Sequence, residues 1–219
     1  MSLAIFDLDN TLLAGDSDYL WGVFLADAGL VDRDFYEREN ERFYREYREG
    51  RLDIFEFLRF SLEPLSEHDL ERLHELRRRF IEQHIDPIIL PAGRRLIESH
   101  KAKGDTPLII TATNAFVTAP IAERLEIPHL LATEPQMEDG RYTGEVAGTP
   151  CFQDGKVTRL DQWLEQRHET LEASWFYSDS HNDIPLLEKV EHPVAVDPDG
   201  SLRQHAGERG WKIISLRGD

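Results

Sequence analysis

The sequence contains a single cysteine, Cys151, among 219 residues. One cysteine cannot form an internal disulfide, and this scarcity is usual for proteins of a reducing compartment. No stretch approaches the ~20 apolar residues that a membrane-spanning helix requires. The N-terminus also lacks the basic residues that precede the apolar run of a secretory signal. We therefore expect a cytoplasmic protein that does not enter a membrane.

Basic residues are scarce relative to acidic ones. The chain has 25 Lys and Arg against 42 Asp and Glu, which gives a formal net charge of −17. Nucleic-acid phosphates and anionic lipid surfaces are bound by basic proteins, so neither is expected as a partner. Most of the acidic residues are explained by their contribution to solubility.

The order of predicted elements indicates an α/β fold. Hydrophobic residues make up 40% of the chain, enough for a core, and the length suits one domain with an insertion or two small ones. From about residue 87 onward, short apolar strands alternate with helices, a pattern typical of a doubly wound parallel sheet. Residues 16–86 are predicted to be wholly helical, and residues 137–147 to form a small β-hairpin. We predict a core domain formed by residues 1–15 and 87–219, with residues 16–86 as an all-helical cap insertion.

Three element boundaries follow from local signals. The segment Ser66-Glu67-His68-Asp69 resembles a capping box that opens the fourth helix of the insertion. The apolar strand at residues 107–110 is predicted to end at Thr111, with Ala112-Thr113-Asn114 opening a helix. Residues 128–132 are predicted to form a strand separate from the hairpin.

Two carboxylates follow the first apolar strand. Asp7 and Asp9 lie two residues apart after Leu3-Ala4-Ile5-Phe6, so an extended chain would point both to one side. The carboxyl end of a buried parallel strand is where open α/β sheets bind their ligands. Like charges this close resist ionisation unless a cation lies between them, and oxygen ligands of this kind suit Mg²⁺.

Similar side chains recur at later strand ends. Thr111 follows a buried strand, Lys156 lies near the start of a helix, and Asp179 and Asp183 follow the strand that ends at Ser178. Hydroxyls, ammonium groups and helix N-termini bind phosphate oxygens. Each residue alone also has an ordinary explanation, such as a helix cap or a surface lysine. Their conjunction along one sheet is hard to explain as capping.

This set of motifs resembles the haloacid dehalogenase (HAD)-type phosphatase superfamily, in the phosphoserine phosphatase-like branch (subfamily IB). The family order appears here as Asp7/Asp9/Thr11, then Thr111, then Lys156, then Asp179/Asp183. The resemblance spans nearly the whole chain, including the helical insertion. It implies a Rossmann-like HAD core beneath the cap, and a Mg²⁺-dependent hydrolase of phosphoric monoesters. A Ser at 178, where many members have Gly, is expected to have little consequence.

The resemblance also assigns roles to these residues. Asp7 is expected to be the nucleophile that forms an aspartyl phosphate, and Asp9 the general acid and then base. Asp7, Asp179 and the main-chain carbonyl of Asp9 are expected to hold Mg²⁺. Asn182 and Asp183 would not bind the metal directly, and Asp183 would orient its bound waters, with Asn182 nearby. Thr111 and Lys156 are expected to bind the phosphoryl oxygens.

The cap residues bear on the substrate. Asp16 lies nine positions after Asp7, where phosphoserine phosphatases usually have Glu for the substrate amine. Counting along the chain places Ser61 where those enzymes have an Arg for the substrate carboxylate, unless Arg51 or Arg59 takes that role. An amine without a carboxylate would satisfy both observations, so the expected reaction converts L-histidinol phosphate into L-histidinol and phosphate, a step of histidine biosynthesis. Phosphoserine hydrolysis, and a catalytically silent binding protein of the same fold, are the alternatives.

Overall fold

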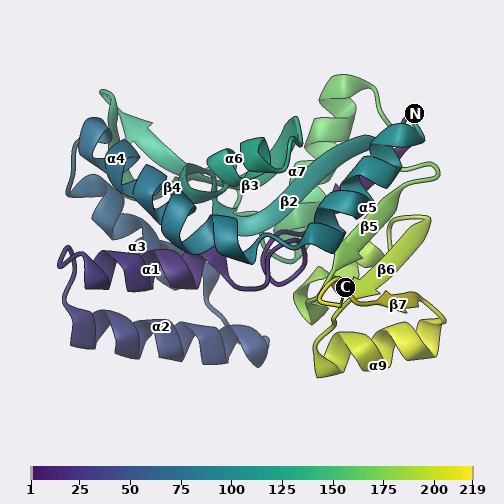
Figure 1. Ribbon diagram of the computed structural model, residues 1–219, viewed down its shortest axis with the longest axis horizontal. Coiled ribbons are helices and arrows are strands. Elements are labelled where there is room, and N and C mark those ends of the chain that lie inside the picture. Colours follow the sequence, from purple (N-terminus) through teal and green to yellow (C-terminus); the bar gives the residue numbers. More distant parts are fainter. Residues whose placement is uncertain (1, 219) are drawn as a thin grey trace.

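The computed structural model, which describes residues 2–218, has a seven-stranded sheet at its centre (Figure 1). The strands are β1 (Leu3–Phe6), β2 (Thr106–Asn114), β3 (His129–Glu138), β4 (Arg141–Ala147), β5 (Trp175–Ser178), β6 (His192–Val196) and β7 (Lys212–Ile214). Their order across the sheet is β4-β3-β2-β1-β5-β6-β7. All neighbours are parallel except the pair of β3 and β4, which form the predicted hairpin. The expected α/β fold is confirmed.

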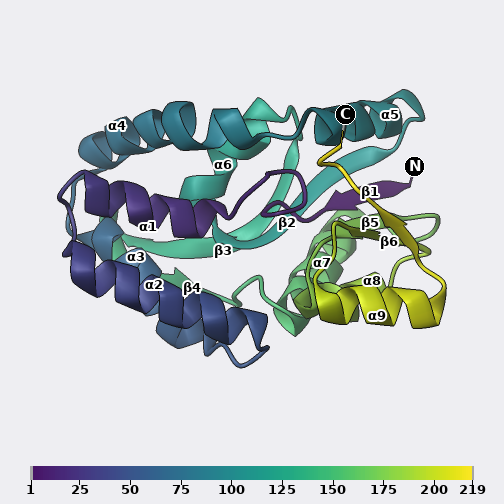
Figure 2. The same cartoon turned by 60° about the horizontal axis from the view of Figure 1, so that its bottom comes forward.

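Helices cover both faces of the sheet. One face is packed by α5 (Pro91–Ala102) and α6 (Ala115–Arg124), and the other by α7 (Asp154–Arg167), α8 (Ile184–Leu187) and α9 (Gly200–Arg209) (Figure 2). The alternation of side chains along β1 divides the core accordingly: Ala4 and Phe6 belong to one hydrophobic cluster, Leu3 and Ile5 to the other. This two-sided burial explains why the parallel strands are continuous apolar runs.

Residues between β1 and α5 form the helical insertion. It contains α1 (Ser17–Asp27), α2 (Arg33–Arg48), α3 (Ile54–Ser66) and α4 (Leu70–Phe80), followed by a π-helical turn (Ile81–Ile85) and a 3-10 turn (Asp86–Ile88). Trp21 and Phe24 of α1 are buried in the same hydrophobic cluster that contains Phe6 of the sheet. The proposed cap therefore shares a continuous core with the sheet, as its position beside β3 and β4 also suggests (Figure 1).

The structure corrects three of the predicted boundaries. The fourth helix is capped by Asp69, whose carboxylate accepts from the main-chain N–H of Arg72, while Ser66 ends the preceding helix. β2 continues through Asn114, with an irregular register against β3 after Ile110, and Asn114 then caps α6. β3 is one long strand from His129 to Glu138 that runs directly into the hairpin, and its register against β4 shifts between Pro135 and Met137.

Candidate active site

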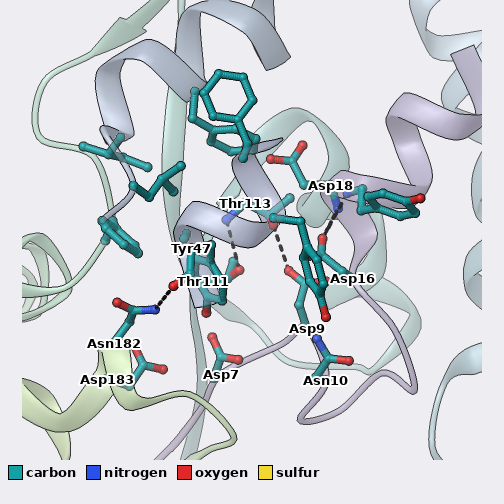
Figure 3. Close-up of a pocket in the computed structure, with 18 of the residues that line it drawn as sticks. Asp7, Asp9, Asn10, Asp16, Asp18, Tyr47, Thr111, Thr113, Asn182 and Asp183 are labelled. Carbon is teal, nitrogen blue, oxygen red and sulfur yellow. Dashed lines mark hydrogen bonds between the residues drawn. The ribbon is translucent and has the colours of Figure 1, made fainter. Parts of the chain in front are cut away.

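The central strands bring the predicted motifs together. β1 lies between β2 and β5, so Asp7 after β1, Thr111 in the second half of β2 and Asp179 after β5 lie together at the carboxyl end of the central strands. Asp7, Asp9, Thr111 and Asp183 line a single pocket that also contains Lys156 (Figure 3). The positions of Asp7, Asp9, Thr111 and Asp183 near strand ends predicted that these residues would lie together, because the carboxyl ends of neighbouring parallel strands meet.

Lys156 connects two of the acidic motifs. Its Nζ donates to Asp7 Oδ1 at 2.7 Å and to the carboxylate of Asp183 at 2.8 Å, and all three side chains are buried. The lysine reaches this position because Gly155 lets the chain turn tightly: a Cβ there would lie 2.0 Å from the carbonyl oxygen of Pro150. Ser178, for which little consequence was expected, donates to Asp183 at 2.6 Å. The ion pairs fix Asp7 in the centre of the site.

Thr11 joins Asp7 to the motif after β5. Its hydroxyl lies 3.3 Å from Asp7 Oδ2 and 3.2 Å from Asp179 Oδ1, and it accepts from the main-chain N–H of Asp179 at 3.1 Å. The site thus gathers three carboxylates, Asp7, Asp179 and Asp183, around one ammonium group. This excess of buried negative charge, carried by oxygen atoms, is the environment that a divalent cation would stabilise.

Asp9 faces away from this group and toward the insertion. Its Oδ1 accepts from the main-chain N–H of Ser17 at 2.6 Å, and its Oδ2 accepts from Thr113 Oγ1 at 2.7 Å. Thr113 was not predicted as a site residue; its place two positions after Thr111, on the same side of an extended chain, is the signal that could have identified it. The carboxylates of Asp7 and Asp9 are therefore held by different partners.

Burial governs the protonation of both aspartates. Desolvation raises the pKa of Asp7 to about 7, an effect that Lys156 opposes. Desolvation, followed by the nearby negative charge of Asp16, raises the pKa of Asp9 to about 6, and the hydrogen bonds to Ser17 and Thr113 oppose it. A carboxyl group with a pKa near neutrality can exchange protons with substrate at physiological pH.

The insertion forms the other wall of the pocket. Asp16 lines it as expected, and its Oδ1 also caps α1 by accepting from the main-chain N–H groups of Asp18 and Tyr19, each at 3.0 Å (Figure 3). Tyr47 of α2 reaches across to the motif after β5, where its hydroxyl donates to Ser180 at 2.9 Å. Asn182 lines the pocket too, and its amide lies 3.5 Å from the carbonyl oxygen of Tyr47. The insertion and the sheet are thus joined by hydrogen bonds at the site.

Three other positions considered from the sequence lie outside the pocket. Ser61 is buried within the insertion, and its hydroxyl has no hydrogen-bond partner within residues 2–218. Arg51 is exposed and pairs with Glu49, and Arg59 lines a separate surface hollow. His181, which lies between the two aspartates of the last motif, does not line the pocket either, and its Nδ1 lies 2.7 Å from Asp199 Oδ2. Counting along the chain therefore misplaced Ser61 relative to the site, and neither arginine reaches it.

The sheet topology and the four motifs define a class of hydrolase, and comparison with known proteins agrees. The family described as haloacid dehalogenase-like hydrolase matches residues 4–188, which is most of the chain. The chain therefore belongs to the haloacid dehalogenase-like hydrolases. Within them it is a phosphatase of the phosphoserine phosphatase-like branch, as the sequence resemblance predicted.

One curated relative and two solved structures show how similar the chain is to individual proteins. A histidinol-phosphatase of Neisseria meningitidis serogroup C (strain 8013) is 46% identical over 220 residues, covering 99% of each chain. A solved structure of a protein of unknown function from Bordetella pertussis Tohama I is 43% identical, with a TM-score of 0.92 and 98% of each chain covered. A substrate-bound phosphoserine phosphatase has a TM-score of 0.72 at 20% identity, covering 100% of this chain and 94% of its own, and this shows the shared fold alone.

Proposed function

We propose that this phosphatase hydrolyses a small phosphomonoester through an aspartyl-phosphate intermediate. Asp7 attacks phosphorus and the ester bond to the leaving alcohol breaks, while Asp9 gives that alcohol its proton. Asp9 then takes a proton from the water that attacks the aspartyl phosphate, which releases phosphate and restores Asp7. Lys156 and Thr111 bind the phosphoryl oxygens. The separate hydrogen-bonding environments of the two aspartates support this division of roles.

We propose Mg²⁺ as the cofactor. No group of three acidic, histidine or cysteine side chains within residues 2–218 is placed to hold a metal ion by itself. The donor set fits a cation that takes the carboxylates of Asp7 and Asp179 with a main-chain carbonyl at Asp9, and Mg²⁺ usually keeps several waters besides. Asn182 and Asp183 would support these ligands. When bound, the ion would offset negative charge on the phosphoryl group.

The leaving group that the pocket best fits is a phosphorylated amino alcohol, with L-histidinol phosphate as the leading candidate. The main support for this substrate is the charge of the side chains that line the pocket. Within residues 2–218 it contains five aspartates but a single basic side chain, Lys156, which is already paired with Asp7 and Asp183. A substrate carboxylate would meet no free cation there and would be buried at a cost of several kcal/mol.

A substrate amine, in contrast, has a partner. Both cap hydrogen bonds of Asp16 use Oδ1, which leaves Oδ2 to accept from an ammonium group. The full-length relative named as a histidinol-phosphatase supports the same substrate. A role in histidine biosynthesis would place the enzyme in the cytoplasm, in keeping with the finding that no helix among the described residues is long and apolar enough to cross a membrane.

Steady-state kinetics with Mg²⁺ on a panel of phosphomonoesters tests the proposal. We expect kcat/KM for L-histidinol phosphate to exceed that for L-phosphoserine by at least about 100-fold, since an unpaired carboxylate costs several kcal/mol. Asp16→Asn should reduce kcat/KM for L-histidinol phosphate by roughly 10- to 100-fold, the scale of a charged hydrogen bond to its ammonium group. Equal kcat/KM values for the two esters would contradict the assignment, and a preference for phosphoserine would support the alternative function.

A binding protein without catalysis is the second candidate that the sequence left open. Such a descendant would be expected to lose Asp7, Asp9 or Lys156, and the chain retains all three within one pocket. Absence of turnover on every phosphomonoester, together with tight binding of one of them, would favour this candidate over the phosphatase.

A further inference from the structure

The part of the pocket that lies farthest along the insertion contains polar groups that the phosphatase reaction does not use. Asp18 of α1 and Asn40 of α2 both line the pocket beyond Asp16. They are not part of any of the four motifs, and neither was predicted from the sequence. Their surroundings show which chemistry they could recognise.

Asp18 has no cationic partner. Its carboxylate forms no ion pair within residues 2–218, and its one side-chain hydrogen bond among these residues is from Asn114 Nδ2 at 3.5 Å, the limit of a hydrogen bond. Burial, then the nearby charges of Asp16 and Asp9, raises its pKa well above the usual range. An acidic residue in the first turn of a helix gains only about 0.3–1 kcal/mol from the helix dipole, and it gains this equally well when exposed. The dipole therefore does not explain its position in the pocket.

Asn40 is the more unusual of the two. It is only 8% exposed, and its carboxamide makes no hydrogen bond within residues 2–218 although it borders the pocket. Its Oδ1 and Nδ2 are not among the fully buried polar atoms without a partner, so the carboxamide keeps access to the pocket and is free to bond a ligand or water there.

Gly22 places this amide beside α1. A Cβ on Gly22 would lie 2.6 Å from Asn40 Nδ2 and 3.0 Å from the ring of Tyr36, so only glycine lets the amide approach. Gly22 follows Asp18 by one helical turn on the same face of α1. The missing side chain thus allows the carboxamide to approach the face of α1 that carries the carboxylate.

Aromatic rings line much of the pocket. Six of them line it: Tyr19, Phe43, Tyr44, Tyr47, Phe57 and Phe152. The rings of Tyr19 and Tyr44 lie 6.3 Å apart and are 39% and 44% exposed, and the rings of Tyr47 and Phe152 lie 6.1 Å apart. Surfaces of this kind favour a flat, aromatic or cationic ligand group over a short polar one.

We propose that Asp18 and Asn40 form a subsite for a nitrogen heterocycle, the imidazole ring of the leaving group, with the aromatic residues as its walls. A neutral imidazole has one N–H donor and one ring-nitrogen acceptor. The carboxylate of Asp18 accepts from the N–H, and the Nδ2 amide of Asn40 donates to the other nitrogen. An imidazolium, with two donors, is bound by the same carboxylate and by Asn40 Oδ1. Asp16 remains the partner of the ammonium group.

This inference rests on the proposed substrate, so the experiment separates the two. The probes are L-histidinol phosphate and O-phosphoethanolamine, which share the amine and differ in the ring. The readout is the ratio of their kcat/KM values in the unmutated enzyme and in Asp18→Asn and Asn40→Leu. A phosphatase assay with 4-nitrophenyl phosphate and thermal unfolding identify any variant that fails to fold. If one variant does not fold, the other still tests the subsite.

We expect each variant to lower the ratio by about 10- to 100-fold, the effect of one hydrogen bond to a charged group or of one unpaired ring nitrogen. The inhibition constant of the product L-histidinol should rise by a similar factor. Glu41→Gln is the matched control, because Glu41 follows Asn40 on α2 but is exposed, and it should change neither value.

The outcomes are distinguishable. If the unmutated enzyme does not prefer L-histidinol phosphate to O-phosphoethanolamine, the proposed substrate is wrong. If it has the preference but both variants keep it within about twofold, the ring is bound elsewhere, and the inference fails while the proposed function stands.

Discussion

Thr113 Oγ1 lies 2.7 Å from Asp9 Oδ2 and donates a hydrogen bond to it, across 104 positions of sequence. Thr113 lies in the part of β2 where the register against β3 is irregular, and it is 5% exposed. A hydroxyl fixed in this way orients the carboxyl group that we propose protonates the leaving group. It also favours the ionised form of Asp9, which opposes the effect of burial on its pKa.

We predict that Thr113→Val lowers kcat for alkyl phosphates by roughly 5- to 13-fold, since one hydrogen bond contributes about 1–1.5 kcal/mol. The loss should be smaller with 4-nitrophenyl phosphate, whose leaving group needs little protonation. Thr113→Ser retains the hydroxyl and is the matched control, with kcat close to that of the unmutated enzyme. An equal loss with both substrates would show that Thr113 acts on packing and not on the acid.

Substitution of Asp7 and substitution of Asp9 should impair different steps of the reaction. Asp7→Asn is expected to have no turnover with any substrate, because an amide is not a competent nucleophile. Asp9→Asn should still form a phosphoenzyme from 4-nitrophenyl phosphate but release it slowly, since a good leaving group needs no acid while the attacking water needs a base. A burst of nitrophenol with phosphate retained on the protein after acid quench would show this. The exposed Asp34→Asn is the control; hydrolysis by Asp7→Asn would refute the assignment.

Removal of Mg²⁺ should abolish turnover, and its return should restore it. Asp7, Asp179 and Asp183 place more negative charge in the site than Lys156 offsets, so a divalent cation should also stabilise the fold. At 100-fold excess over Kd we expect Tm to rise by on the order of 5 °C. Asp179→Asn should reduce this shift strongly. Full activity after EDTA treatment would exclude the proposed cofactor.

The strand-end residues were predictable because their positions follow from topology. Asp7, Thr111 and Asp179 each follow an apolar run, and parallel strands must place such ends together. Lys156 required the family resemblance, because a lysine near the start of a helix is usually a surface residue. In the structure it is 4% exposed and paired with two carboxylates.

The residues contributed by the insertion were less predictable. Their positions depend on how α1 and α2 pack, and helical periodicity fixes which face is apolar but not which neighbour it meets. Counting from Gly50-Arg51-Leu52 led to Ser61, which lies on a buried side of α3 away from the pocket. Asn40 carries no sequence signal of its own within the charged run of α2. Its role depends on the absence of a side chain at Gly22, a residue distant in sequence.

A buried hydrogen-bonded group behind the sheet provides a test of pH-dependent stability. His100, at the end of α5, is 1% exposed, with Nδ1 2.7 Å from Asp105 Oδ2 and Nε2 2.8 Å from the hydroxyl of Tyr177. With a neutral ring, Nδ1–H donates to Asp105 and Nε2 accepts from Tyr177. Burial lowers the pKa of His100, and the carboxylate of Asp105 opposes that effect while Lys103 adds to it.

The sign of the pH dependence follows. An unfolded histidine has a pKa of about 6.5, so between pH 7 and 5 the unfolded chain binds a proton that folded His100 takes up less readily. The stability contributed by His100 is therefore present above pH 6.5 and is lost as pH falls. The pKa of Asp105 is also lowered: burial acts to raise it, but the hydrogen bonds from Ser2 and His100 prevail. Its contribution is lost only below about pH 4, outside this window.

We predict that His100→Gln lowers the free energy of unfolding by roughly 1–3 kcal/mol at pH 7, because a buried hydrogen-bonded group is lost. The deficit relative to the unmutated protein should narrow at pH 5, where that protein has itself lost the contribution of neutral His100. Urea unfolding of both proteins at the two pH values measures this. His74→Gln, at an exposed position of α4, removes one histidine without burial and should give the same deficit at both pH values. A deficit for His100→Gln that stays constant or widens at pH 5 would mean that the ring is charged in the folded protein, bound to Asp105 as an imidazolium.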